Sequence, residues 1–319
     1  MQVDRPLRSD SASAVVAPAV PKTAVKAGLA ISPFNYECVE ALGQAADGRA
    51  LLRAHLGASF TLTASGRQAL GLVLDRIGLA SDDEVAIMTT SGGSYVSACV
   101  TSTIEQRCRW AIGISGSSKA VIVIHEWGRP CEALAEAMAS GLPVIEDCAY
   151  AFAARHPDGR QAGRDGHYAI YSLPKLFSVS FGGLAVSRMG GTLPSPLDVK
   201  EQDYLCRAIA PELSRLPDLL AKRAKVWRHL AGMFSELGAR PFFEPRATDT
   251  PAVFMFRHDA ETVPLSEVRE RFEAHGVEAS VFYGENAFYV PAHHRMSEAC
   301  CAWLAAIYAK LLADHGALA

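Results

Sequence analysis

The sequence predicts an α/β protein in which helices sandwich a mostly parallel central sheet, followed by a smaller C-terminal α/β domain. Two observations predict this fold class. Between residues 59 and 187, short apolar runs typical of buried strands alternate with segments of helical periodicity, and repeated strand–helix units build parallel sheets. Beyond Arg188 the pattern changes to a shorter set of helices and strands, and 319 residues are enough for two domains.

The expected elements follow from apolar periodicity, taken in chain order. Apolar residues three or four apart predict helices over residues 36–42, 48–56 and 68–77, and an apolar run predicts a strand over 59–63. The same criteria predict strands over 84–88, 120–125, 143–147, 168–172 and 183–187, and helices over 94–104 and 131–140. In the C-terminal part we expect a helix over 213–237 with a break at Pro217, and then strand, helix, strand and helix over 252–257, 266–275, 279–283 and 297–313.

These elements divide the chain into three expected parts. They are a mobile N-terminal tail over residues 1–24, a large domain over 25–205 and a small C-terminal domain over 206–319. The tail carries Asp4 and Asp10 and has no uninterrupted apolar segment, which argues against a secretory signal.

Composition excludes several classes of partner. The formal net charge of −3 and the pI near 6.4, without any run of Lys or Arg, give no electrostatic footprint for nucleic acid. No stretch approaches the roughly 18 consecutive apolar residues that could span a bilayer. The eight cysteines include no Cys-x-x-Cys pair, so we expect reduced thiols in a cytoplasm.

A turn of small residues, Ala64-Ser65-Gly66, joins the strand over 59–63 to the next helix. Such a turn leaves several amide N–H groups free at the positive end of the helix, which suits a phosphate group. The alternative is an ordinary helix cap. The turn alone does not decide between them.

Asp147 closes the apolar run over 143–147. In an open α/β sheet, ligands bind beyond the carboxyl ends of the strands, so a carboxylate at this point faces the binding crevice. Its alternative role is to cap whatever segment follows the strand.

Lys175 is one of only eight lysines and lies in the loop over 173–182, between two expected strands. An enclosed lysine loses part of its ammonium hydration, which lowers its pKa and frees the amine for a Schiff base. The alternative is a solvated loop lysine of ordinary pKa. Together, a lysine, an acid and a turn of free amides are the three parts that a pyridoxal phosphate (PLP) enzyme needs.

By contrast, His125 and the pair His293-His294 have no third ligand at metal-site spacing, so we interpret them as structural histidines and predict no metal site.

Several motifs resemble the DegT/DnrJ/EryC1/StrS aminotransferases, a family of the type I PLP fold. Ser65-Gly66 followed by a helix resembles the family's "SGT" turn, and Asp83-Glu84-Val85 resembles its "GDEV" strand. The run from Gly141 to Tyr150 is close to "GIPVIEDAAQA", and Lys175 precedes Gly182-Gly183 by the family's interval. Gly276-Val277-Glu278 and Val290-Pro291-Ala292-His293 resemble later motifs of the family.

The resemblance implies a role for each matching residue. Lys175 is the implied Schiff-base lysine and proton carrier, and Asp147 keeps the pyridine nitrogen of the cofactor protonated. Tyr150 stands where the family contacts the ring hydroxyl. Tyr95 matches the aromatic residue that stacks on the ring, with a core aromatic as the alternative. The implied cofactor-binding residues are Asp147, Tyr150, Tyr95, Ser65, Gly66, Arg67, Gln68, Ser172 and Lys175.

The chain also departs from the family pattern. Arg67 stands where the family has the threonine of "SGT", and Ile170 stands where a phosphate-binding serine precedes the lysine. Two hydroxyl ligands are therefore missing. Arg67 could hold the phosphate through its fork of donors, and Ser172 or Ser180 could replace a hydroxyl.

The resemblance implies a PLP-dependent aminotransferase that moves an amino group from a small-molecule donor to a keto or aldehyde acceptor. A sugar-derived or secondary-metabolite acceptor, a homodimer and a cytoplasmic location are the corresponding expectations. Two alternatives stay open at this point: elimination or epimerisation on the same cofactor, and a catalytically idle relative with a binding role.

Overall fold

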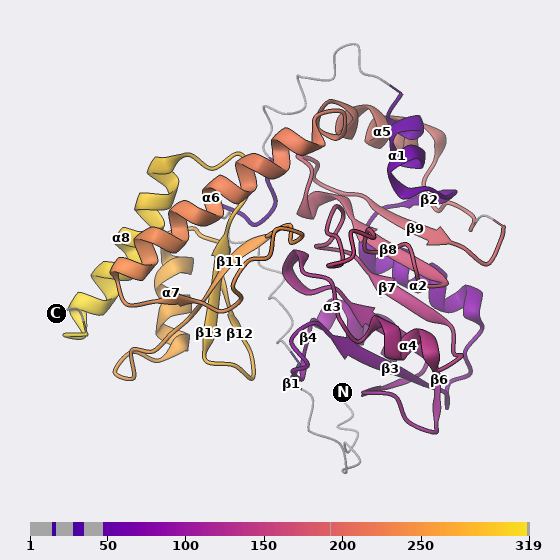
Figure 1. The fold of residues 1–319 in the computed structure, drawn as a ribbon, viewed down its shortest axis with the longest axis horizontal. Coiled ribbons are helices and arrows are strands. Elements are labelled where there is room, and N and C mark those ends of the chain that lie inside the picture. Colours follow the sequence, from indigo (N-terminus) through magenta and orange to yellow (C-terminus); the bar gives the residue numbers. More distant parts are fainter. Residues whose placement is uncertain (1–14, 17–27, 35–46, 192, 318–319) are drawn as a thin grey trace.

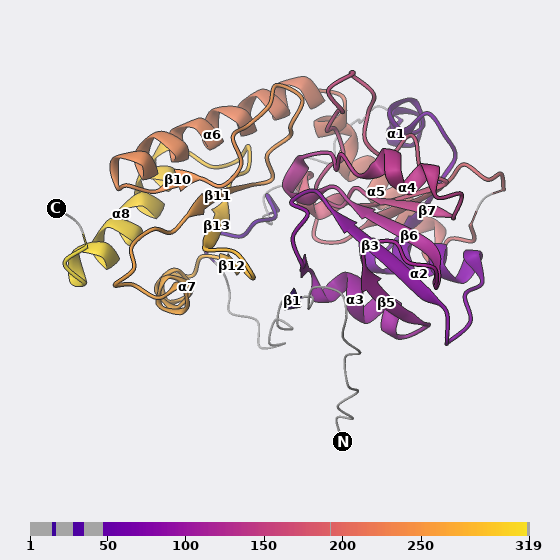
Figure 2. The same ribbon diagram turned by 60° about the horizontal axis from the view of Figure 1, so that its bottom comes forward.

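The structure, a computed structural model, describes residues 15–16, 28–34, 47–191 and 193–317. Most of the expected tail over 1–24 and the expected helix over 36–42 lie outside these residues. Figure 1 shows two sheets side by side, one in each half of the molecule. The long helix α6 (Leu216–Glu236) runs from one half to the other (Figures 1 and 2).

The first half holds a seven-stranded sheet with the order β2-β9-β8-β7-β6-β3-β5. Its strands are β2 (Phe60–Thr63), β3 (Glu84–Thr89), β5 (Arg109–Ile112), β6 (Ser118–Ile124), β7 (Val144–Asp147), β8 (Tyr168–Ser172) and β9 (Gly183–Ser187). The pairs from β8 to β5 are parallel, and β9 runs antiparallel to both its neighbours, β2 and β8. The predicted mostly parallel sheet is therefore confirmed.

Helices cover both faces of this sheet. They are α1 (Gly48–Leu56), α2 (Gly66–Ile77), α3 (Ala98–Glu105), α4 (Leu134–Ala139) and α5 (Val199–Leu213). Leu70 of α2 packs with Val85 and Ile122 on one face. On the opposite face, Leu134 of α4 packs with Val121 and Val144, and α1 and α5 cover the β8–β9 end. A strand buried on both faces explains why these runs are almost wholly apolar.

The second half holds a four-stranded antiparallel sheet with the order β10-β11-β13-β12. Its elements are β10 (Arg240–Pro241), β11 (Val253–Arg257), α7 (Leu265–Ala274), β12 (Ser280–Phe282), β13 (Ala287–Pro291) and α8 (Glu298–Asp314). Phe254 and Phe256 of β11 pack under α6, α7 and α8. The alternate residues Val253 and Met255 point the other way, into a cluster with residues of the first half. The side of this sheet that faces the first half therefore lines the junction between the two.

The structure differs from the expected elements at several places. Ser97 caps α3, so the helix begins at Ala98, and Tyr95 lies in the two-residue strand β4 (Tyr95–Val96), which pairs with β1 (Val15–Val16). Helix α5 and strands β5 and β13 were not expected; α5 contains Pro211, which masks its helical pattern. Pro217 does not break α6 but lies in its first turn, where a missing N–H costs nothing. None of the described helices is long and apolar enough to cross a membrane.

Candidate active site

Lys175 lies at the carboxyl-terminal edge of the seven-stranded sheet. It ends the short helix η3 (Leu173–Lys175), directly after β8, and is half-buried. Its turn is fixed by backbone hydrogen bonds from Leu176 and Phe177 to the carbonyl oxygen of Leu173. The ammonium nitrogen of Lys175 lies 4.8 Å from the centroid of the Tyr150 ring, within range of a cation–π interaction.

The pKa of Lys175 differs from the sequence-based expectation. Burial lowers the pKa of this ammonium group, as expected, but the side chains of Tyr150 and Glu278 act in the opposite direction and outweigh burial. The net pKa of Lys175 is therefore raised above its usual value, and the predicted lowered pKa is wrong. Glu278 follows the later Gly-Val motif, so the second half of the molecule supplies this negative charge.

Asp147 lies at the end of β7, next to β8 and on the same edge of the sheet as Lys175. It is 5% exposed, and burial raises the pKa of its carboxyl group. One carboxylate oxygen accepts a hydrogen bond of 2.9 Å from the backbone N–H of Ala149. The other has no hydrogen-bond partner in the part of the chain that the structure describes. Asp147 thus supports the turn after β7 and also offers a second oxygen to a donor.

The turn before α2 has the free amides that the sequence suggested. The Ser65 hydroxyl accepts from the N–H of Gln68 at 3.1 Å, and the Gln68 side chain accepts from the N–H of Ala64 at 2.8 Å. Within the described chain, the N–H groups of Gly66 and Arg67 have no acceptor. A Cβ atom on Gly183 would lie 2.4 Å from the Ser65 carbonyl carbon, so only glycine lets β9 approach this turn.

The candidates for the missing hydroxyls lie in different places. Ser172 lies beside the start of α2, because a Cβ atom on Gly66 would be 3.2 Å from the Ser172 Cβ. Arg67 is exposed, and its guanidinium lies 2.8 Å from the sulfur of Cys99 at the start of α3. Ser180 is exposed, and Ile170 is buried in the core. Arg67 and Ser172 are therefore both carried by segments that meet at the amino-terminal end of α2.

Aromatic side chains fill the junction next to Lys175. Trp127 contacts Tyr150 with ring centroids 4.8 Å apart and Tyr289 of β13 at 4.5 Å. Tyr95 contacts Phe282 of β12 at 4.7 Å. Both expected ring-contacting tyrosines, Tyr95 and Tyr150, thus belong to one cluster that joins the two halves of the molecule.

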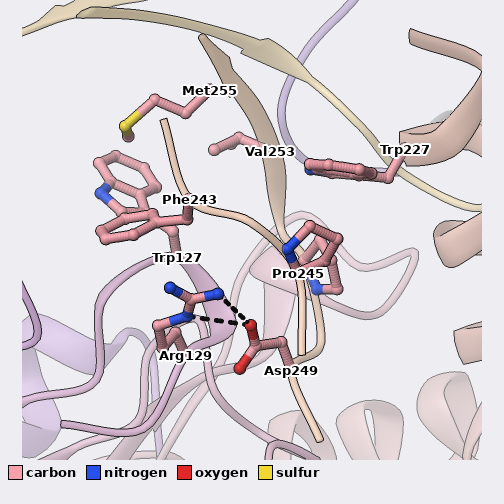
Figure 3. Close-up of a pocket in the computed structure, with 9 residues that line it drawn as sticks. Trp127, Arg129, Trp227, Phe243, Pro245, Asp249, Val253 and Met255 are labelled. Carbon is pink, nitrogen blue, oxygen red and sulfur yellow. Dashed lines mark hydrogen bonds and ion pairs between the residues drawn. The ribbon is translucent and has the colours of Figure 1, made fainter. Parts of the chain in front are cut away.

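Trp127 has a backbone conformation that bulky residues rarely adopt. Its φ of 56° lies in the left-handed region, and the residue is buried in the short helix η2 (Glu126–Gly128). It also lines the pocket that Figure 3 shows, where Arg129 pairs with Asp249 at 2.7 Å. The N–H groups of Thr250 and Ala252 donate to the carbonyls of Gly128 and Trp127. These contacts fix the strained segment to the second half.

Glu146, beside Asp147, is fully buried and satisfied. Its carboxylate accepts from the N–H groups of Gly163, Asp165 and Gly166 at 2.6–2.9 Å and faces the Nε2 of His125 at 2.9 Å. The Nδ1 of His125 accepts from the N–H of Cys131, so the ring proton is on Nε2 and is donated to Glu146. Both ring nitrogens of His125 therefore have partners among the described residues.

We expect Glu146→Gln to reduce the free energy of unfolding by roughly 3 kcal/mol or more at pH 7, because an amide group would face buried N–H donors. Burial raises the pKa of Glu146, but the His125 and backbone hydrogen bonds reverse this and hold it below the usual value. The stabilisation is therefore complete above the unfolded-state pKa and lost as the pH falls through the lower folded-state value. Denaturant titration at several pH values measures it, with the exposed Glu270→Gln as control; a loss under about 1 kcal/mol would contradict the assignment.

Three residues of this region have no signal in the sequence that marks them. Trp127 is one aromatic residue among many, and its left-handed conformation is visible only in the structure. Arg223 of α6 donates a hydrogen bond of 2.7 Å to the carbonyl oxygen of Lys175, 48 residues away along the chain. Cys99 had only the general expectation of a reduced thiol. Glu278 belongs to the family-like motif Gly276-Val277-Glu278, and this motif could have marked it.

Solved structures with the same architecture define the class of this fold. The aminotransferase TlmJ from Streptoalloteichus hindustanus superposes with a TM-score of 0.68 at 17% identity, covering 87% of this chain and 95% of TlmJ. Spr1654 from Streptococcus pneumoniae, described as a sugar aminotransferase, superposes in its apo form with a TM-score of 0.67 at 15% identity. The superposition covers 89% of this chain and 97% of Spr1654. 3-Amino-5-hydroxybenzoic acid synthase superposes with a TM-score of 0.67 at 17% identity, covering 89% of this chain and 98% of the synthase. The predicted type I PLP-transferase fold is confirmed.

The sequence match is narrower and more specific. Residues 100–189 match the model of the DegT/DnrJ/EryC1/StrS aminotransferase family, and this stretch contains Asp147, Tyr150 and Lys175. The family resemblance is therefore confirmed over residues 100–189, which include the motif from Gly141 to Tyr150 and Lys175. Structures of Spr1654 in a PMP form and a PLP form also superpose, with TM-scores of 0.68 and 0.62. No curated protein sequence matches this chain.

Proposed function

We propose that this chain is a PLP-dependent aminotransferase that transfers an amino group from a small-molecule donor to a keto or aldehyde acceptor. The observation that carries the proposal is that Lys175, Asp147 and the free amides of α2 meet at one edge of one sheet. The match of residues 100–189 to an aminotransferase family supports it. Neither alternative, elimination or an idle relative, has an observation of its own in its favour.

The residues at this edge fit the cofactor. A protonated pyridine nitrogen needs a buried anionic acceptor, and Asp147 has one carboxylate oxygen without a partner in the described chain. A phosphate needs several donors, and the amides of Gly66 and Arg67 lie at the positive end of α2 with Ser65, Gln68 and Ser172 beside them. An aldehyde needs an amine, and Lys175 lies over the Tyr150 ring at the same edge of the sheet.

When bound, PLP supplies an electron sink for a negative charge that develops at the α-carbon of the substrate. Lys175 would move the proton at that carbon, because its nitrogen lies 4.8 Å from the centroid of the Tyr150 ring, at the edge of the sheet where β7 ends at Asp147. Asp147 would stabilise the positive charge of the ring nitrogen. Tyr150 would donate to or accept from the ring hydroxyl, and Tyr95 would pack against the ring face.

The proposal is tested by presenting the PLP-loaded protein with a panel of amino donors, starting with glutamate. Transfer converts the bound cofactor to its amine form and the donor to the matching keto acid, which absorbance and mass spectrometry detect. Release of ammonia without the amine form would instead favour elimination. If no donor in the panel lost its amino group under any condition, this result would contradict the proposal.

We expect Arg67→Ala to weaken PLP binding about 10-fold or more, because a guanidinium at the start of α2 is the strongest phosphate donor available there. Fluorescence titration of the apo protein with PLP measures the dissociation constant. Arg53→Ala, an exposed change at the end of α1, is the control. An unchanged dissociation constant would show that the backbone amides and Ser172 suffice.

The finer expectations are part of the same proposal. We propose an acceptor that is a sugar-derived or secondary-metabolite intermediate, since TlmJ, Spr1654 and 3-amino-5-hydroxybenzoic acid synthase share the fold. We also propose a homodimer, which light scattering can test. A cytoplasmic location is supported by the free state of all the cysteines that the structure describes.

A further inference from the structure

Arg223 is the largest of the fully buried side chains in the described part of the chain, at 2% exposure. It projects from α6, and one terminal nitrogen of its guanidinium donates to the carbonyl oxygen of Lys175 at 2.7 Å. A guanidinium carries five N–H donors. Within the described residues, this hydrogen bond is the only one that Arg223 makes, it forms no ion pair, and its Nε is buried without a partner.

A second, half-buried charge holds the middle of the same loop. Glu212, near the end of α5, accepts from the N–H of Ser178 at 2.8 Å and from its hydroxyl at 2.7 Å. The ring of His294 pairs with the same carboxylate at 2.9 Å. The Lys175 loop, defined as residues 173–182, is thus held by α6 at Lys175 and by α5 at Ser178.

The two charges contribute differently to stability. Glu212 has three hydrogen-bond donors of its own and does not depend on Arg223. Arg223 loses the hydration of a full positive charge and gains, among the described residues, a single hydrogen bond, a poor exchange for the fold. Burial accordingly lowers the pKa of Arg223 to about 10, although Glu212 and Tyr150 act in the opposite direction. A charge at such a position, in contact with the backbone of Lys175 at the carboxyl-terminal edge of the sheet, points to a role in the site rather than in the fold.

We propose that Arg223 is a positioning residue that fixes the backbone of Lys175, and hence the reach of its amine, at the expense of global stability. The proposal rests on the assignment of Lys175 as the cofactor lysine. It goes beyond that assignment because it gives a function to a residue outside the family match at 100–189.

The test compares Arg223→Met with Arg223→Lys and with Arg228→Met, a change at an exposed position of the same helix. Hydrogen exchange is measured on the protein without cofactor. The amides of Leu173, Leu176, Phe177 and Val179, all hydrogen-bonded within the loop, report on its opening. In Arg223→Met we expect these amides to exchange about 5-fold faster or more, while the melting temperature is unchanged or higher. Arg223→Lys, which keeps a donor, gives an intermediate rate, and Arg228→Met gives the wild-type rate.

A second readout links the loop to the cofactor. We expect PLP to dissociate from Arg223→Met about 10-fold faster than from the wild type. Unchanged exchange of the loop would overturn the proposal, and so would a variant that fails to fold or melts at a clearly lower temperature, since Arg223 would then support the fold. Because exchange is measured without PLP, a wrong assignment of the cofactor would appear only in the second readout.

Discussion

Lys175→Ala is expected to remove both the visible absorbance of bound PLP and amino transfer, lowering the transfer rate by roughly 1,000-fold or more. No other described lysine can replace it: Lys119 lies in β6, Lys200 begins α5, Lys222 and Lys225 lie on exposed turns of α6, and Lys310 lies on α8. The variant loses the amine that, in the proposed function, would hold the aldehyde and move the proton. The fold should persist, because alanine leaves in place the side chains with which the Lys175 ammonium interacts among the described residues, Tyr150 and Glu278. Absorbance spectra and half-reaction rates with an active donor measure the effect.

The control is Lys222→Ala, which changes an exposed lysine of α6 and should leave both readouts at the wild-type level. Circular dichroism shows that each variant is folded. If Lys175→Ala retained the visible band and transferred amino groups within a few-fold of the wild type, another residue would hold the cofactor. The assignment of Lys175 would then be wrong.

Asp147→Asn is expected to have the second largest effect, a loss of roughly 100-fold to 1,000-fold in the half-reaction rate. The amide keeps an oxygen that can accept from the N–H of Ala149, so the turn after β7 stays in place. It removes the negative charge that would hold the ring nitrogen in its protonated state. Stopped-flow absorbance with a saturating amino donor measures the rate.

The stability of the Asp147→Asn variant should not fall with its activity. Burial raises the pKa of Asp147, which means that the ionised carboxylate is disfavoured in the folded protein relative to the unfolded one. Its unfavourable contribution appears as the pH rises above the unfolded-state pKa, so at pH 7 the Asp147→Asn variant, which is neutral at this position, should be at least as stable as the wild type. Asp218→Asn, an exposed change in α6, is the control. A fully active Asp147→Asn protein would contradict the role given to the carboxylate.

Much of the fold was predictable because its strands are local and apolar. Residues 120–125, 143–147 and 168–172 lie in the interior of the sheet, so each segment is mostly apolar, with Glu146 and Asp147 as the acidic exceptions. Helix α5 was missed because Pro211 and several charged residues interrupt its apolar pattern, although its start is fixed by a capping box of Asp198 and Glu201.

The candidate site was predictable where chemistry follows strand order. Asp147 and Lys175 each end a strand or directly follow one, and parallel neighbours bring such ends to one edge. Arg223 and Trp127 were not predictable. Arg223 contacts Lys175, which is 48 residues away along the chain, and the left-handed φ of Trp127 has no signal in the sequence. The raised pKa of Lys175 could not be read either, since burial, which it shares with any enclosed lysine, is outweighed by the positions of Tyr150 and Glu278.

The central claim is that Lys175 carries the cofactor, and one measurement tests it most directly. The wild-type protein is loaded with PLP, reduced with borohydride, digested and analysed by mass spectrometry for a pyridoxyl group. We expect the adduct on Lys175 alone. An adduct on another lysine, or no adduct after reduction of a protein shown to be folded, would contradict the account.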